Sequence, residues 1–249
     1  MSDRIEKEKK FHNTRFAEDT RKHLSKYYSI ISNASKLYEE LISANVSGKK
    51  VLEYGCGEGS LSFDLAQKGA EVYGIDISEV AIEKAQEISV AQKLDDSIKF
   101  YVMNAEELSF TENFFDIICG GAILHHLDLD KALSALNKVI KKDGKAIFLE
   151  PLGHNIFINV YRAITGNLRT QDEHPLKNED LKLFEKYFSN INIHYFHLTT
   201  LMAVPFRRFG VFARLLRLFS KVDDFLFKYP FFKKNAWIVV IKLTQPLKS

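Results

Sequence analysis

The stretch from Val51 to Ser60 most constrains the fold, because a short apolar run turns there, through three alternating glycines, into a helix-like pattern. Gly55, Gly57 and Gly59 allow positive φ angles and carry no Cβ atom, so the turn can be tight and a small molecule can approach the backbone. The exposed amides at the start of the following helix would face the same crevice. The stretch therefore predicts a strand, a ligand-binding turn and a helix.

The next apolar run, from Glu71 to Asp76, ends in an acid 17 residues after Gly59. An acid at that place can accept hydrogen bonds from both hydroxyls of a ribose. The turn lacks the last glycine of the dinucleotide-binding pattern, because Ser60 stands there. Three glycines alone are consistent with a simple turn, and Asp76 alone with a helix cap, but the combination favours a ribose-containing ligand.

The glycine turn together with Glu53 and Asp76 resembles the class I S-adenosylmethionine-dependent methyltransferases of small molecules, over roughly residues 50–150. The resemblance implies S-adenosylmethionine as cofactor and S-adenosylhomocysteine as product. It also implies that Glu53 orients the turn and the methionine end of the cofactor, that the glycines line the cofactor, and that Asp76 holds the ribose. The cofactor-binding residues that it implies are Glu53, Gly55, Cys56, Gly57, Gly59, Asp76, Ile77, Asn104, Ala105, Glu106 and Gly120.

The heptad from Asn104 to Phe110 resembles the adenine-side motif of that family, which usually has an acid where this chain has Asn104. The amide of Asn104 can still pair with the adenine amino group through its carbonyl oxygen. Glu106 is the nearby acid that could share this task.

Strands alternate with helices as far as Glu150, which predicts a parallel sheet. Ser78 is a good N-cap for a helix that should run to about Gln92, and residues 129–142 form a second amphipathic pattern. The predicted fold is α/β: a Rossmann-like, doubly wound, mostly parallel seven-stranded sheet with an antiparallel last strand. After the first two strands, the other five are expected at 98–103, 114–119, 145–150, 190–198 and 237–243.

Two regions are expected: an N-terminal helical lid at 1–46, and a methyltransferase domain at 47–249 with helical insertions after strands five and six, at about 151–180 and 200–235. In related methyltransferases such an N-terminal segment closes over the cofactor. Candidate lid contacts are Phe11, His12, Tyr27 and Tyr28, although ordinary packing explains any one of them equally well.

Composition limits the class of protein. A chain of 249 residues that is 46% hydrophobic can bury one large core. Its charged start, from Met1 to Lys10, has no apolar leader, and no run approaches the ~18 apolar residues of a membrane span, so we expect a cytoplasmic protein. The two cysteines, Cys56 and Cys119, are too few for a disulfide framework or a zinc site and are expected to be packing residues.

The run from Gly120 to Leu127 follows the fourth strand at the carboxyl edge of the sheet, where ligands bind in open α/β folds. His125, His126 and Glu150 are therefore candidates for taking the proton of the acceptor or fixing its hydroxyl or amine. Hydrogen-bonding support explains the two histidines equally well. No metal site is expected, because adjacent histidines seldom converge on one ion, even with Asp128 nearby.

The segment after Glu150 is too polar and too long for a plain connection and is typical of a lid or a substrate loop. Its two arginines could donate paired hydrogen bonds to an anionic acceptor. In the alternative interpretation the segment is only lid architecture, and Arg169 pairs with Asp172 or Glu173. The candidate acceptor contacts are His154, Asn155, Arg162, Arg169 and His174.

Positive charge is confined to the C-terminal segment. The chain has 35 basic and 32 acidic residues, of which ten basic and two acidic lie in 200–249, so this segment carries +8 and residues 1–199 carry −5. If 205–221 is one helix, its basic residues form a stripe of ~80° on an otherwise apolar surface. Arg208 would then project into the apolar arc and would need an acid or a polar part of the substrate beside it.

Such a surface suits a cap over a hydrophobic acceptor pocket, a helix resting on anionic lipid, or a homodimer interface through residues 206–232, and we rank them in that order. The predicted function is transfer of a methyl group from S-adenosylmethionine to a small, partly hydrophobic organic acceptor, with no nucleic-acid partner. The alternatives are an RNA or protein methyltransferase and a cofactor-binding protein without transferase activity. Two motifs of nucleic-acid methylation, Asn-Pro-Pro-aromatic and a Pro-Cys nucleophile, are absent from the sequence.

Overall fold

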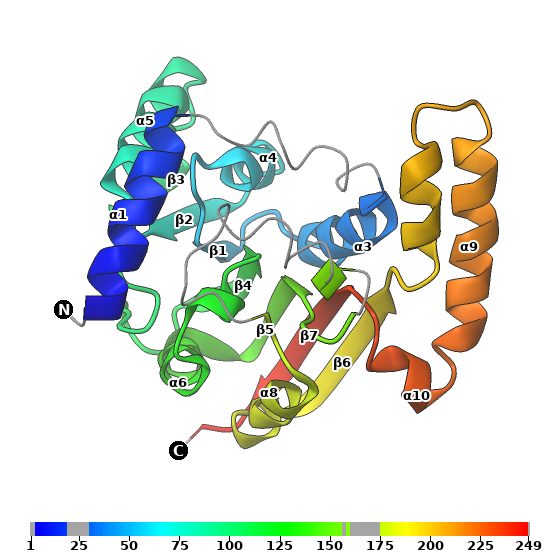
Figure 1. Cartoon of the computed structure of the whole chain (residues 1–249). Coiled ribbons are helices and arrows are strands. Elements are labelled where there is room, and N and C mark those ends of the chain that lie inside the picture. Colours follow the sequence, from blue (N-terminus) through cyan, green and yellow to red (C-terminus); the bar gives the residue numbers. More distant parts are fainter. Residues whose placement is uncertain (1–2, 19–29, 156–157, 160–174, 249) are drawn as a thin grey trace.

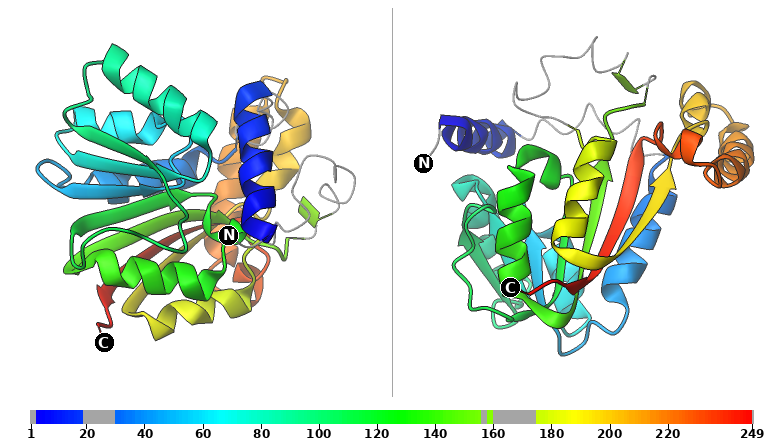
Figure 2. Two further views of the ribbon diagram at one scale, coloured as in Figure 1. Left: turned by 90° about the vertical axis from the view of Figure 1, so that its left-hand side faces the viewer. Right: turned by 90° about the horizontal axis from the view of Figure 1, so that it is seen from below.

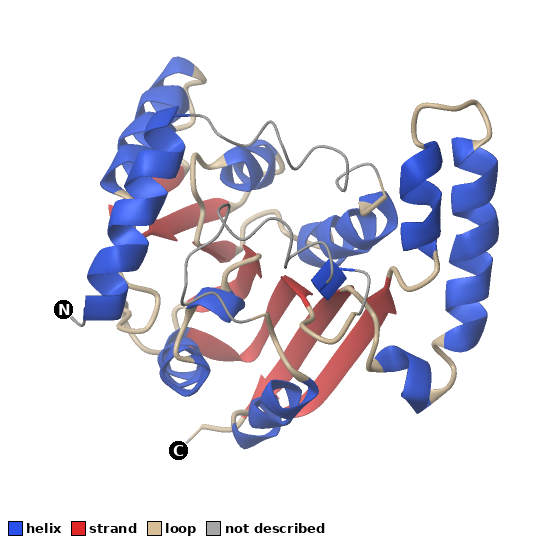
Figure 3. Cartoon of the chain, viewed as in Figure 1, coloured by secondary structure: helices blue, strands red, loops and turns tan. Residues whose placement is uncertain are grey.

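The computed structural model describes residues 3–18, 30–155, 158–159 and 175–248 (Figure 1). Its centre is a seven-stranded sheet in the order β3-β2-β1-β4-β5-β7-β6, shown in red in Figure 3. The strands are β1 (Lys50–Tyr54), β2 (Glu71–Asp76), β3 (Ile98–Val102), β4 (Phe115–Gly121), β5 (Ile140–Pro151), β6 (Phe188–Phe196) and β7 (Ile238–Pro246).

The pairing confirms the predicted topology. β1 pairs in parallel with β2 and β4, β2 with β3, and β4 with β5, whereas β7 runs antiparallel to both β5 and β6. The strand order reverses between β1 and β4. The crevice at the carboxyl ends of these two strands is therefore the switch point at which open α/β sheets bind ligands.

Helices cover both faces of the sheet, so the fold is doubly wound (Figure 2). One face is covered by α3 (Ser32–Ser43), α4 (Ser60–Gln67) and α5 (Glu79–Ala91), which bury side chains such as Ile42 and Phe63 against it. The other face is covered by α6 (Leu129–Val139) and α8 (Asn178–Leu183), through Leu133 and Leu181.

Local signals explain where these elements begin and end. Ser78 caps α5 as predicted, because its Oγ accepts a hydrogen bond of 3.2 Å from the amide of Ala81. The helix predicted at 129–142 ends earlier, at Val139. Ile140 is fully buried and pairs with Phe115, so β5 begins there and is longer than predicted.

The N-terminal segment contains α1 (Asp3–Glu18), which lies beside α5 at the carboxyl edge of the sheet (Figures 1 and 2). Ile5 and Phe16 of this helix are buried. Tyr27 and Tyr28, two of the candidate lid contacts, lie outside the described residues.

A helical hairpin joins β6 to β7. It consists of the 3-10 helix η5 (Thr200–Phe206), α9 (Phe212–Leu226) and the short α10 (Pro230–Lys233). The single helix predicted at 205–221 is wrong, because a turn at 207–211 separates η5 from α9. Pro205 has no amide hydrogen and Gly210 is a poor helix former, so both favour the break. None of the helices in the described part of the chain is long and apolar enough to cross a bilayer.

Candidate functional site

The glycine turn leads from β1 to α4. Gly55, Gly57 and Gly59 have φ angles of 72°, 54° and 82°, in the region that favours glycine. A Cβ atom on Gly55 would lie 2.9 Å from Cδ1 of Ile123, and one on Gly59 would lie 2.8 Å from Cζ of Phe100. The missing Cβ atoms thus allow these neighbouring side chains to pack on the turn, a reason that the sequence did not indicate.

Asp76, at the end of β2, is held against this turn. One carboxylate oxygen accepts a hydrogen bond of 2.8 Å from the amide of Gly57, and the other accepts one of 2.9 Å from the amide of Ser78. Each carboxylate oxygen has a second acceptor site, so Asp76 can still bind two hydroxyls. The half-buried Ile77 follows it at the same edge.

Glu53 is a buried acid at the carboxyl end of β1. It is 7% exposed and accepts a hydrogen bond from the hydroxyl of Ser62. Burial raises the pKa of Glu53 to about 8, and the negative charge of Asp76 adds to this, whereas the bond from Ser62 opposes it. Among the residues that the structure describes, no cationic side chain pairs with Glu53. A cationic ligand bound beside Glu53 would therefore stabilise its ionised carboxylate.

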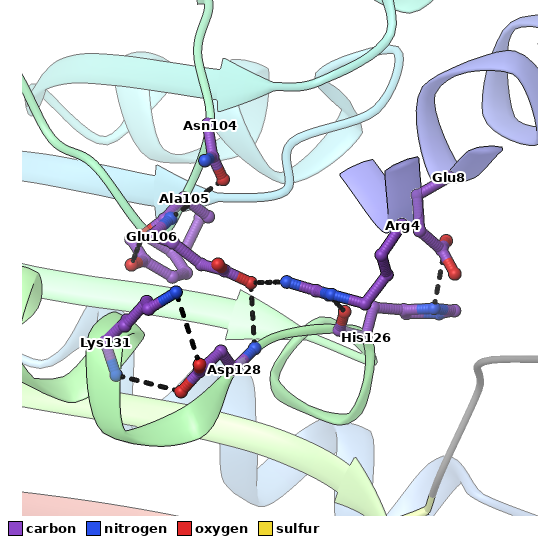
Figure 4. Close-up of polar contacts among 9 residues, drawn as sticks. Arg4, Glu8, Asn104, Ala105, Glu106, His126, Asp128 and Lys131 are labelled. Atoms are coloured by element: carbon purple, nitrogen blue, oxygen red, sulfur yellow. Dashed lines mark hydrogen bonds and ion pairs between the residues drawn. The ribbon is translucent and has the colours of Figure 1, made fainter. Parts of the chain in front are cut away.

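The adenine-side loop is occupied by contacts within the protein (Figure 4). Oδ1 of Asn104 accepts a hydrogen bond of 3.0 Å from the amide of Glu106, and the carbonyl of Ala105 accepts one from the hydroxyl of Tyr54. The carboxylate of Glu106 forms an ion pair with Arg4 of α1 and accepts a bond of 2.8 Å from the amide of Asp128. The charge of Glu106 is thereby paired within the protein, and its expected adenine contact stays a prediction.

Two further residues of the implied cofactor set are packing residues in the crevice wall. A Cβ atom on Gly120 would lie 2.8 Å from the carbonyl oxygen of Tyr54, which explains the glycine without a ligand. Cys56 is 6% exposed and Cys119 is fully buried, and both are free thiols. The prediction that the two cysteines are packing residues is confirmed.

Glu150 organises the loop after β4. Its carboxylate is fully buried, accepts hydrogen bonds of 2.9 and 2.8 Å from the amides of Ile123 and Leu124, and lies 2.7 Å from Nδ1 of His125. With these partners Glu150 fixes the orientation of His125, and its role as a base stays a prediction. His125 is 7% exposed and keeps Nε2 as the nitrogen that faces away from Glu150.

His126, on the 3-10 helix η2 (Leu124–His126), contacts the N-terminal helix. Its carbonyl accepts a hydrogen bond of 2.6 Å from Arg4, and its Nδ1 lies 3.4 Å from Oε2 of Glu8. Burial lowers the pKa of His126, and Glu8 opposes this effect. The neutral imidazole is therefore favoured at this place.

Other contacts hold α1 across the same edge. Oγ of Ser78 donates a hydrogen bond of 2.7 Å to Oδ1 of Asn13, and Lys9 forms an ion pair of 2.5 Å with Glu79. In this helix the sequence indicated Phe11 and His12 as contacts, but not Arg4, Glu8 and Asn13. Their partners are distant in the sequence, so spacing gave no signal.

Three of the predicted acceptor contacts, Asn155, His154 and Arg208, lie in the part of the chain that the structure describes. Asn155 is fully buried, donates a hydrogen bond of 2.8 Å to the carbonyl of Asn235 and accepts one from the amide of Ile158, so it is structural. Nε2 of His154 accepts a bond of 3.3 Å from the amide of Asn178 at the start of α8. Arg208 lies exposed in the turn before α9 and needs no acid partner there. Arg162, Arg169 and His174 lie outside the described residues.

The hairpin between β6 and β7 is anchored on one side and apolar on the other. Leu201, Val204 and Leu216 pack against Ile30 and Trp237. Of the 14 large apolar side chains that are exposed in the described chain, nine belong to this hairpin: Met202, Phe206, Phe209, Val211, Leu218, Val222, Phe225, Tyr229 and Phe231. Seven exposed basic residues accompany them: Arg207, Arg208, Arg214, Arg217, Lys221, Lys228 and Lys234.

Comparison with known proteins identifies the family to which this chain is similar. Residues 45–187, more than half of the chain, match a family model described as a methyltransferase domain. Over 107 residues the chain is 34% identical to the ubiquinone biosynthesis O-methyltransferase of Pseudomonas syringae pv. tomato. That match covers 42% of this chain and 45% of the relative, so the chain spans about half the length of the curated relatives it matches.

Solved structures share the fold. Phosphoethanolamine N-methyltransferase 2 of Haemonchus contortus, in complex with phosphomonomethylethanolamine and S-adenosylhomocysteine, has a TM-score of 0.64 at 18% identity, over 93% of this chain and 59% of that one. The 4+2 cyclase SpnF has a TM-score of 0.58 at 16% identity, over 86% of this chain and 82% of that one. At these identities the likeness shows the fold alone.

Proposed function

Because the chain belongs to the methyltransferase domain family, we propose that it transfers a methyl group from S-adenosylmethionine to a small, partly hydrophobic organic acceptor. The observation that carries this proposal is the meeting of the buried Glu53, the glycine turn and Asp76 at the switch point of the sheet. The ubiquinone biosynthesis relative supports a small organic acceptor and makes oxygen the first candidate for the methylated atom.

The residues of the crevice fit this cofactor. Asp76 offers acceptor sites to the ribose hydroxyls, and Glu53 is a buried acid beside which the ammonium of the methionine end would be stabilised. The cofactor supplies an activated methyl on its sulfonium. The chain must align the acceptor, exclude water and take a proton. Effective molarities of ~10⁵ M or more make alignment the largest contribution, and a general base adds about 10² to 10⁴.

His125 is the residue that we propose to take the proton or to fix the acceptor. Its Nδ1 lies 2.7 Å from Oε2 of Glu150, so the carboxylate fixes the orientation of the ring and would stabilise the imidazolium that forms when His125 takes a proton. His126 lies beside it, with ring centroids 4.2 Å apart, but is engaged by α1. Glu150 is thus a positioning residue.

We further propose that residues 1–46 act as a lid on the domain at 47–249. The support is the set of contacts from α1 to the segments after β2 and β3 and to α5: Arg4 with Glu106, Asn13 with Ser78, and the carbonyl of Phe16 with Lys84 of α5 at 2.5 Å. These contacts support a lid role, in which α1 would cover the edge at which the cofactor binds.

Cofactor binding should depend on pH through Glu53. Because its pKa is about 8 in the free protein, Glu53 is mostly protonated at pH 7 and must lose that proton when an ammonium group binds beside it. The affinity for S-adenosylhomocysteine should therefore rise by up to about tenfold for each pH unit between pH 6 and 8 and level off above it. Calorimetry in two buffers of different ionisation enthalpy counts the released proton.

The Glu53→Gln variant is the control, because it keeps the shape and removes the titrating group. It should bind more weakly, with a flat pH dependence over this range. A pH dependence that is the same in Glu53→Gln and in the unchanged protein would assign the effect to another group.

We also propose that the exposed face of the hairpin at 200–235 binds an anionic membrane. Exposed aromatic side chains beside exposed arginines and lysines form the combination that binds at the interface of anionic lipid. A second copy of the chain carries the same positive charge on this surface, so lipid is the better complement. A lipophilic acceptor held in the bilayer would then be close to the crevice.

Vesicle binding tests this surface. The protein should bind vesicles of phosphatidylglycerol and phosphatidylcholine, release them at high salt, and bind pure phosphatidylcholine much less. Each basic residue near such a surface contributes ~1 kcal/mol, so replacing Arg214 and Arg217 with Gln should weaken binding roughly 30-fold. Val90→Ser, which changes an equally exposed apolar residue on α5, is the control. A dimer in solution without vesicle binding would show that a second copy covers the surface instead.

A cofactor-binding protein without transferase activity is the rival, since a protein named as a cyclase has this fold. Transfer of a labelled methyl group from S-adenosylmethionine to a panel of phenols, amines and carboxylic acids separates the two. Labelled product supports the proposal. Tight binding of the cofactor with no labelled product across lipophilic and polar acceptors supports the rival.

A further inference from the structure

Three side chains with metal-binding atoms meet between α1 and the loop after β4. Glu8 and His12 lie one turn apart on α1, and His126 comes from η2 (Figure 4 shows Glu8 beside the ring of His126). One ligand atom from each of the three side chains lies within 4.8 Å of the other two. The side chains are 7%, 16% and 11% exposed, so the cluster is largely shielded from water.

The spacing of these atoms fits metal coordination better than hydrogen bonding. Oε2 of Glu8 lies 3.4 Å from Nε2 of His12 and 3.4 Å from Nδ1 of His126. Good N–H···O hydrogen bonds are about 2.7–3.2 Å long. Two ligands that each lie about 2.0–2.1 Å from one tetrahedral ion are roughly 3.4 Å apart. Oε2 of Glu8 therefore lies from each of the two histidine nitrogens at the distance expected between two ligands of one tetrahedral ion.

The charges and neighbours around the cluster permit an ion. Arg4, which donates a hydrogen bond to the carbonyl of His126, forms an ion pair with Glu106, so its charge is balanced. Nδ1 of His125 is held by Glu150, which keeps that ring out of the cluster. The rings of His12 and His126 meet edge to face, with centroids 5.4 Å apart and an interplanar angle of 79°. Each ring can thus direct a different nitrogen lone pair into the same space.

We propose that Glu8, His12 and His126 bind a divalent transition-metal ion of the zinc type, which fastens α1 to the loop after β4. Two imidazoles and one carboxylate are a ligand set that such ions take, and they leave a fourth position for water or for an oxygen atom of the acceptor. The site joins the N-terminal helix to the loop that carries His125. Its occupancy controls how firmly α1 lies over the crevice.

Titration of Zn²⁺ into the full chain tests the site, with a chromophoric chelator as competitor. One ion should bind per chain, and Co²⁺ in its place should show the visible absorption of a tetrahedral or five-coordinate site. Glu8→Gln and His12→Ala should each weaken Zn²⁺ binding by at least ~100-fold, because losing a direct ligand costs more than losing an outer partner. Zn²⁺ should also raise the thermal midpoint of the unchanged protein but not of Glu8→Gln.

Two controls keep the test specific. Glu6→Gln removes an exposed carboxylate from the same helix, and His194→Ala removes an exposed histidine on β6, so both should bind Zn²⁺ like the unchanged protein. Circular dichroism and binding of S-adenosylhomocysteine show that each variant is folded. Absence of one-to-one Zn²⁺ binding, or equal affinity in folded Glu8→Gln, would show that these groups form only a carboxylate–histidine network. Neither result tests whether the crevice binds S-adenosylhomocysteine, because Glu8, His12 and His126 are not among the residues assigned to the cofactor.

Discussion

Glu150→Ala is expected to lower the free energy of unfolding by about 3–5 kcal/mol. The carboxylate of Glu150 is fully buried and is the acceptor for the amides of Ile123 and Leu124 and the partner of His125. Without it three buried polar groups lose their partner, and each such loss costs ~1–3 kcal/mol. Denaturant unfolding measures the change, with the slope of the transition as a check that the unfolded state is unaltered.

Glu150→Gln separates stability from chemistry. Its amide oxygen can still accept from the two backbone amides, so it should retain most of the stability that alanine loses. The negative partner of His125 is gone, however, so methyl transfer should fall by about 10²-fold or more while cofactor affinity stays the same. An alanine variant within 1 kcal/mol of the unchanged protein would contradict the role of Glu150 as the organiser of this loop.

Asp223→Ala is expected to release the hairpin from the sheet. Asp223 is 4% exposed and accepts hydrogen bonds from the amide of Leu198 at 3.0 Å, the amide of Thr199 at 2.6 Å and the hydroxyl of Thr200 at 2.9 Å. It is therefore the polar anchor of α9, and its loss should cost about 3–5 kcal/mol in that part of the molecule.

Hydrogen exchange measures this effect locally. Amides of α9 should lose protection by roughly 100-fold or more, whereas those of β1 and β2 should be little changed. The neighbouring Asp224 is exposed, so Asp224→Ala is the matched control and should exchange normally. Loss of protection throughout the sheet would mean that the hairpin is part of the folding core and not a separate attachment.

The cofactor half was predictable because its signals are local. The bounds of β2 and the cap at Ser78 match the expectation, since both follow from residues next to each other in the chain. The parallel order followed from the alternation of strands and helices. The prediction of one continuous helix at 205–221 was wrong. It relied on the amphipathic pattern and did not consider Pro205 and Gly210, which favour a break in the helix.

The acceptor side was less predictable for two physical reasons. The sequence does not distinguish an asparagine side chain that faces a ligand from one that forms hydrogen bonds with buried backbone groups. Asn155 is of the second kind, because its side chain donates to the carbonyl of Asn235. Contacts across the edge of the sheet also join residues far apart in the chain, such as Arg4 with Glu106 and Glu8 with His126. No spacing rule connects these residues, so the sequence indicated an N-terminal helix but not the residues that it contacts.

The central claim is that the crevice formed by Glu53, the glycine turn and Asp76 binds S-adenosylmethionine, and calorimetric titration of S-adenosylhomocysteine tests it most directly. The unchanged protein should bind one equivalent, and folded Asp76→Ala should bind roughly 30-fold more weakly, because two ribose hydrogen bonds of ~1 kcal/mol each are lost. Asp76→Asn, which keeps one acceptor oxygen, should fall between them. Unchanged affinity in folded Asp76→Ala, or tighter binding of NAD than of S-adenosylhomocysteine, would contradict the account.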